Sequence, residues 1–219
     1  MRLYSTYKAY VSRTNKIILN IMAIIGAIIA FLTSADESLV LMPLAVLTTA
    51  YVAIAGVMDF FQFGGALSKK GNIPESILCT FKGKELLQKA VIADRFAHLI
   101  RLAVILLPTM ILFGAKAADR AWLVIAAWFG AFLSLTLMQL IVRILCVTFQ
   151  TSMLIAYLIM IPLSILLIIP SVTWMFSESV VTGFFIGSAI AYAVIGIALS
   201  VLHAVLAGST YKYKLADNH

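Results

Sequence analysis

The stretch from Gly65 to Arg101 reads GALSKKGNIPESILCTFKGKELLQKAVIADRFAHLIR, and it is the one long polar segment in a chain that is otherwise apolar over long runs. Seven of the sixteen lysine and arginine residues fall within it: Lys69, Lys70, Lys82, Lys84, Lys89, Arg95 and Arg101. Basic residues in membrane proteins concentrate in the loops that remain in the cytoplasm. We therefore expect this segment to be a cytosolic loop of a membrane-embedded helical bundle and to contact a partner in the cytosol.

The composition supports a membrane protein. Hydrophobic residues make up 63% of the chain and charged residues 11%, whereas a soluble domain has about 25% charged residues. The apolar runs are about 20 residues long, enough for a helix to cross a bilayer core of about 30 Å. We predict an all-α, polytopic membrane protein, one transmembrane domain over residues 1–219. Its six expected spans are residues 17–32, 39–58, 96–113, 121–147, 153–169 and 180–206.

The N-terminal segment, residues 1–16, is basic and aromatic. Tyr4, Tyr7 and Tyr10 recur at helical spacing, and such a segment can lie in the headgroup region with its rings toward the lipid. We expect an interfacial helix here. The run at 17–32 could also belong to a signal peptide, but the spans that follow it favour a membrane helix.

Two helices are expected in the cytosolic loop, residues 65–95. Asn72 can cap a helix that has Pro74 in its first turn and Glu75 three residues after the cap, which predicts a short helix over residues 73–79. A second helix is expected to begin at Lys84 and to continue into the span at 96–113. Its amphipathic spacing predicts a polar face formed by Lys84, Glu85, Lys89 and Asp94.

The distribution of charge predicts the orientation. Fourteen basic residues lie in segments assigned to the inside, and two, Lys116 and Arg120, in segments assigned to the outside. This asymmetry places the protein in the cell membrane with both termini in the cytoplasm. Because membrane topology accounts for the net charge of +7, nucleic acid is not expected as a partner.

Catalytic and metal-binding motifs are absent from the sequence. It contains no GxSxG, HExxH or GxxxxGK[ST] pattern and no cysteine and histidine spacing typical of zinc sites. We therefore predict neither an enzyme nor a metal site. None of the expected spans has an acidic residue near its middle, which argues against an ion-coupled carrier. His203, late in the last expected span, is the one candidate within the expected spans for a residue that couples transport to a proton or an ion.

Small residues recur along the last span at Gly183, Gly187 and Ala191. This spacing allows two helices to approach closely. We expect a packing face here, either within one bundle or between two protomers.

The segment Thr80–Lys89, TFKGKELLQK, resembles a recurring stretch in the membrane subunits of ABC-2-type transporters, in which a basic turn precedes the third span. The expected order of elements is also similar to that family. The resemblance implies the permease subunit of an ABC exporter with an unknown substrate. It would pair with a second permease subunit, contact membrane lipid and dock a separate ABC ATPase subunit.

The resemblance also implies roles for the loop residues. The helix at 73–79 would be the coupling helix that the ATPase grips, formed by Ile73, Pro74, Glu75, Ser76, Ile77, Leu78 and Cys79. The following helix would act as a lever that begins with Lys82, Lys84, Glu85 and Lys89. No cofactor would bind this chain directly, because ATP and Mg would sit on the partner subunit. The alternative is a non-transporting accessory or immunity protein of the membrane that acts by binding a partner.

Overall fold

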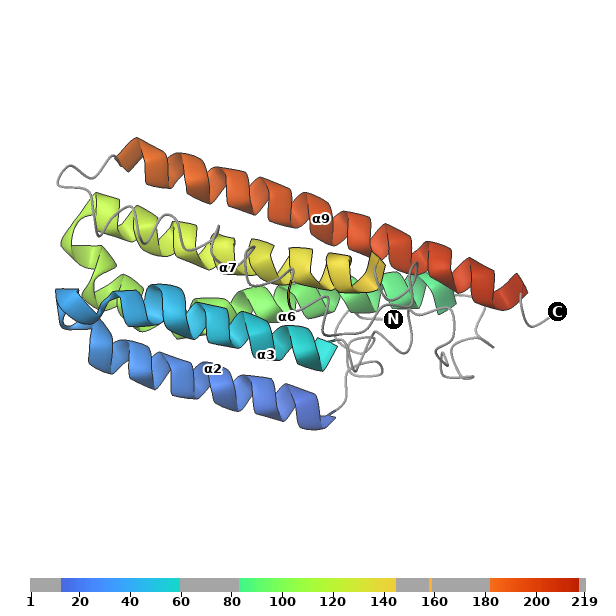
Figure 1. The fold of residues 1–219 in the computed structure, drawn as a ribbon, viewed down its shortest axis with the longest axis horizontal. Coiled ribbons are helices and arrows are strands. Elements are labelled where there is room, and N and C mark those ends of the chain that lie inside the picture. The colour runs from blue at the N-terminus through green and yellow to red at the C-terminus, as the bar shows by residue number, and fades with distance from the viewer. Residues whose placement is uncertain (1–12, 60–82, 145–157, 159–181, 217–219) are drawn as a thin grey trace.

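The computed structural model describes residues 13–59, 83–144, 158 and 182–216. Within these residues the long helices lie side by side in one elongated bundle (Figure 1). The long helices are α2 (Arg13–Ser34), α3 (Thr48–Asp59), α6 (Gly83–Leu112), α7 (Ala118–Ile144) and α9 (Thr182–Ala216). The short elements are η1 (Glu37–Leu39), η2 (Met42–Leu47) and η4 (Gly114–Lys116).

Five helical segments are long and apolar enough to cross a membrane: Arg13–Ser34, Glu37–Met58, Gly83–Lys116, Ala118–Ile141 and Thr182–Ala207. The prediction of a helical fold typical of membrane proteins is confirmed to this extent. The span expected at 153–169 and the coupling helix expected at 73–79 lie outside the described residues. So do residues 1–12 of the expected interfacial helix, whose last four residues form the start of α2.

The two ends of the bundle differ. One end, here called the basic end, carries Arg13 and Lys16 of α2 and Lys84 and Lys89 of α6. The opposite end, here called the turn end, carries the loop from Ala35 to Leu39 and η4, which join consecutive helices (Figure 1). The last residues of α7 lie at the basic end, whereas α9 begins at the turn end (Figure 1).

At the turn end, polar side chains join two neighbouring loops. Arg120 Nη2 donates to Glu37 Oε2 at 3.1 Å, and Lys116 Nζ donates to Glu37 Oε1 at 3.2 Å. Asp36 caps η1 by accepting from the backbone N–H and the hydroxyl of Ser38, and these bonds hold the pKa of its carboxyl below its usual value. The loop between α2 and η2 is thus tied to the loop between α6 and α7.

The second long apolar segment, Glu37–Met58, contains a π-helical turn, η2. Pro43 is at the start of η2, where its missing N–H costs least. The hydroxyl of Thr48 donates to the carbonyl of Leu44 at 2.8 Å where η2 becomes α3. This bond gives a partner to a carbonyl where the helical hydrogen-bonding pattern changes, and η2 continues directly into α3.

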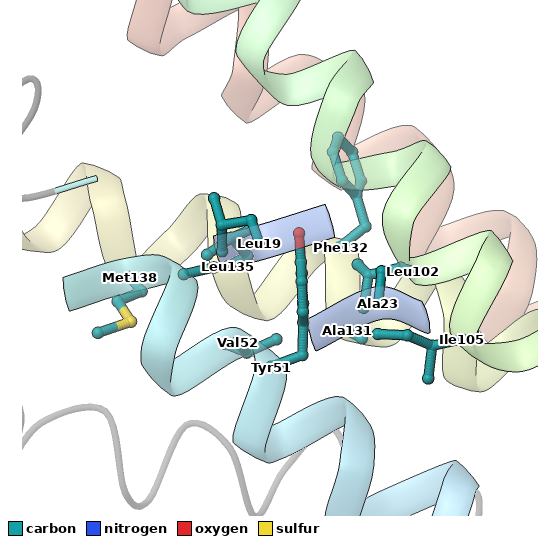
Figure 2. Close-up of a cluster of buried hydrophobic side chains, with 11 residues drawn as sticks. Leu19, Ala23, Tyr51, Val52, Leu102, Ile105, Ala131, Phe132, Leu135 and Met138 are labelled. Atoms are coloured by element: carbon teal, nitrogen blue, oxygen red, sulfur yellow. The ribbon is translucent and has the colours of Figure 1, made fainter. Parts of the chain in front are cut away.

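Two apolar clusters form the core of the described part of the bundle. The central cluster draws on α2, α3, α6 and α7, and Figure 2 shows Tyr51 lying among Leu19, Phe132 and Leu135. The second cluster lies nearer the turn end and also includes Phe185 of α9. Its other buried members are Val40, Leu44, Leu106, Phe113, Leu123, Val124 and Ala127.

Glycines bring helices close together inside this core. A Cβ on Gly56 of α3 would lie 2.2 Å from Met138 Sδ of α7, and one on Gly196 of α9 would lie 3.0 Å from the Phe132 ring. A Cβ on Gly26 of α2 would lie 3.1 Å from Ile105 of α6. These positions set how closely the helices pack.

The structure corrects the expected role of three charges on α6. Asp94 was expected on a polar face and is 1% exposed, while Arg95 and Arg101, counted as loop charges, are 3% and 7% exposed. They are buried because α6 is a single helix from Gly83 whose inward side is already buried at Leu87, Ala90 and Val91. The side of α6 that carries them faces the bundle.

Candidate functional site

A group of buried polar side chains lies on α6 and contacts Asn20 on α2 and Tyr51 on α3. Asp94, His98 and Arg101 follow one another at spacings of four and three residues and therefore lie on one helix face. The same face carries Leu87 and Ile105, so the polar residues continue an apolar stripe. Ionisable side chains inside a membrane bundle are rare and mark functional sites.

His98 connects α6 to α3. Tyr51 Oη and His98 Nδ1 are 2.8 Å apart, and both side chains are almost fully buried. The two rings meet edge to face, with centroids 6.0 Å apart. On the other side of the imidazole, His98 Nε2 lies 3.4 Å from Asp94 Oδ2. Tyr51, His98 and Asp94 thus form a continuous polar chain inside the bundle.

Two arginines flank this chain. Arg95 Nη2 lies 3.6 Å from Asp94 Oδ2, so the carboxylate has an arginine as well as a histidine beside it. Arg101 Nε donates to Asn20 Oδ1 on α2 at 2.9 Å. Through these contacts the buried face of α6 is held by polar groups to both α2 and α3.

The position of the site along α6 follows from the helix rise. With about 1.5 Å per residue, Arg101 lies about 16 Å, His98 about 21 Å and Asp94 about 27 Å from the end of α6 at Leu112. The group therefore extends along α6 from Arg101 toward the basic end.

A second set of buried polar side chains lies between α7 and α9. Gly196 of α9 packs on Phe132 of α7, and the two helices run in the same direction (Figure 1). Residues four and seven positions further along each helix therefore lie at matching levels. They are Thr136 and Gln139 on α7 and Ser200 and His203 on α9, all buried. The Gln139 carboxamide has no hydrogen-bond partner among the described residues.

The expected lever residues lie on the first turns of α6. Glu85 and Lys89 form an exposed ion pair across one helical turn, and Lys84 is half-buried. Lys82 and the seven coupling-helix residues, Ile73 to Cys79, lie outside the described residues. These roles stay predictions.

The small residues of α9 face away from the described helices. Gly183, Gly187 and Ala191 are exposed, and no described atom lies within 4 Å of a Cβ built on either glycine. The packing face predicted for them does not contact the described bundle. Contact with another chain or with residues outside the described ranges stays a prediction.

The buried polar group on α6 contains one carboxylate, Asp94, and one histidine, His98. In the ranges the structure describes, no three histidine, cysteine, aspartate or glutamate side chains gather closely enough to hold a metal ion. The Asp94 and His98 pair is flanked by arginine side chains, which suit hydrogen bonding and ion pairing rather than cation binding. The group is best described as a buried cluster of charged and polar side chains.

Sequence reasoning identified His203 and missed the α6 group. The third span was expected to begin near residue 96. Asp94 was therefore placed on a polar face before the span, and no buried ionisable group was expected on this helix. The spacing of Asp94, His98 and Arg101 in line with Leu87 and Ile105 is a signal that could have found it.

No known protein family matches the chain, and no curated protein or solved structure matches it either.

Proposed function

We propose that this protein is the permease subunit of an ABC exporter, in which α6 connects a cytoplasmic ATPase-docking loop to the membrane helices. The observation that carries the proposal is the course of α6. It is one helix from Gly83 to Leu112, with charged residues on its exposed first turns and polar contacts to two other helices further along.

A continuous helix can transmit displacement along its axis, because its backbone hydrogen bonds make it stiff. A partner that moves the loop before Gly83 would displace the first turns of α6 at the basic end. The contacts of His98 with Tyr51 and of Arg101 with Asn20 would carry that displacement to α3 and α2. Breaking either contact would remove a hydrogen bond from a buried side chain, which costs about 0.5–1.5 kcal/mol.

Two features of the sequence support a partner that supplies energy. The chain has no phosphate-binding loop of its own, and the segment Thr80–Lys89, which leads into α6, resembles a recurring stretch in the membrane subunits of ABC-2-type transporters. The basic end would face the cytoplasm in this arrangement, in keeping with the positive-inside rule.

Co-purification from native membranes tests the proposal. Solubilised wild-type protein is expected to bring down an ATPase, identified by mass spectrometry and by ATP hydrolysis in the eluate. The double variant Ile77→Asp and Leu78→Asp should lose it, because the apolar side of the coupling helix would become charged. Ser38→Asp is the matched control, since Ser38 is exposed at the opposite end. Wild-type preparations free of ATPase would contradict the proposal.

A further inference from the structure

We propose that His98, together with Asp94 and Tyr51, is a proton-binding site inside the bundle, and that proton uptake reverses the hydrogen bond between α6 and α3. The inference goes beyond the proposed function and does not depend on it. It rests on three buried side chains from two helices whose polar atoms form one chain.

The neutral state of the site is determined by its acceptors. A neutral imidazole carries its hydrogen on one nitrogen. An ionised Asp94 accepts only, so the nitrogen that faces it, Nε2, must carry the hydrogen. Nδ1 then has a free lone pair, and the Tyr51 hydroxyl donates to it across 2.8 Å. In this state α3 is the donor and α6 the acceptor.

Proton uptake changes that polarity. A proton from water adds to the Nδ1 lone pair and gives an imidazolium, whose positive charge is balanced by the carboxylate of Asp94. Both ring nitrogens are now donors, so Nδ1–H donates to the oxygen of Tyr51. The Tyr51 hydroxyl hydrogen must then turn toward another acceptor. Release of the proton to water restores the first state, and the contact between α3 and α6 is remade.

The charged surroundings of His98 are provided mainly by α6. They are Asp94, Arg95 and Arg101. Among the helices that pack around α6, α3 contributes Tyr51, and α9 contributes Tyr192 and His203 over residues 182–207. The charges of α2 are Arg13 and Lys16 at the basic end, and those of α7 over residues 118–141 are Asp119 and Arg120 at the turn end. Asp94 is the one carboxylate in this set that lies beside the imidazole.

The route for the proton is short on one side. Asp94 lies about 27 Å from the end of α6 at Leu112 and therefore close to the membrane boundary at the basic end. His98 is one helical turn deeper. The site is thus placed to exchange protons with water at the basic end, while the apolar cluster around Phe113 separates it from the turn end.

The test is ¹⁵N NMR of histidine-labelled, full-length protein in lipid nanodiscs between about pH 5 and 8.5, the range in which histidine titrates. His98→Gln identifies the His98 signals by removing them, and His203→Gln is the matched control at a second buried histidine. At high pH we expect the tautomer protonated at Nε2, and at low pH the imidazolium.

Two variants probe the partners of His98. In Asp94→Asn the ratio of imidazolium to neutral His98 at pH 6 should fall about tenfold or more, because the compensating charge is lost. In Tyr51→Phe the neutral Nδ1 signal should move to the position of a nitrogen without a hydrogen bond. His203→Gln should leave both quantities as in the wild type.

Three results would overturn the proposal: a single protonation state of His98 over the whole range, a tautomer protonated at Nδ1, or an unchanged ratio in Asp94→Asn. Size-exclusion chromatography of each variant establishes that the bundle is folded. Tyr51→Phe removes one oxygen and still reports on the site if Asp94→Asn fails to fold.

Discussion

The hydroxyl of Tyr51 on α3 and Nδ1 of His98 on α6 lie 2.8 Å apart in the interior of the bundle. The Tyr51 ring also belongs to the central apolar cluster (Figure 2). One side chain therefore combines packing among four helices with a polar contact to a buried histidine. The stability of the bundle and the chemistry of the site are linked at this residue.

Tyr51→Phe is expected to destabilise the bundle by about 1–3 kcal/mol, because it removes a hydrogen-bond partner from a buried histidine while the ring keeps its packing. Unfolding in mixed detergent and SDS micelles measures the change. Tyr192→Phe is the control. Because the Tyr192 side chain on α9 is only half-buried, this substitution should lower the stability less than Tyr51→Phe. Equal stability of Tyr51→Phe and wild type would show that the contact contributes nothing.

The hydroxyls of Ser34 and Thr109 are 2.8 Å apart and join α2 to α6 near the turn end. We expect a double-mutant cycle of Ser34→Ala and Thr109→Ala to give a coupling energy of about 0.6 kcal/mol, the average for hydrogen bonds between membrane helices. Ser188→Ala is the control, because its hydroxyl donates within its own helix. No coupling would argue against the α2–α6 contact.

Gly56→Leu should force α3 away from α7, because even a Cβ at this position would lie 2.2 Å from Met138 Sδ. The expected loss of stability is about 1–3 kcal/mol. Gly187→Leu is matched in chemistry and faces open space among the described residues, so the monomer should keep its stability. Equal losses of stability in Gly56→Leu and Gly187→Leu would contradict the close packing of α3 on α7 at Gly56.

Arg120→Gln removes both the ion pair with Glu37 and the contact of its guanidinium with the Phe113 ring, 4.9 Å from the ring centroid. Because the ion pair is exposed, we expect a small fall in melting temperature at low salt. The fall should shrink in about 1 M salt, where charges are screened within about 3 Å. Lys116→Gln should have a weaker effect. A large fall that persists in salt would show that packing on Phe113 dominates.

The sequence could predict the helical membrane class, because long apolar runs leave few other folds open. It could not supply the partners of His98 and Arg101 on other helices, because those partners lie far away in the sequence. Asn20 lies on α2 and Tyr51 on α3, and neither is marked by any local pattern as a partner for α6. The continuity of α6 was predicted from Lys84 onward. The prediction that Asp94 lies on an exposed polar face was wrong, because a charged residue was assumed to be exposed.

The glycines illustrate the same limit. Gly183 and Gly187 form a recognisable motif yet face away from the described helices. Gly56 stands in no such motif, and it is a position where two helices meet. Close packing depends on what stands opposite a residue, which the local sequence does not contain.

The proposed permease function and the proposed proton site both require a bundle that crosses the membrane with its basic end in the cytoplasm. Cysteine labelling in intact cells tests this directly, in a background with Cys79 and Cys146 replaced by serine. Ser38→Cys at the turn end should react with a membrane-impermeant thiol reagent in intact cells. Lys84→Cys at the basic end should react only after permeabilisation. Labelling of both positions from the same side, or of Lys84→Cys alone in intact cells, would contradict the account.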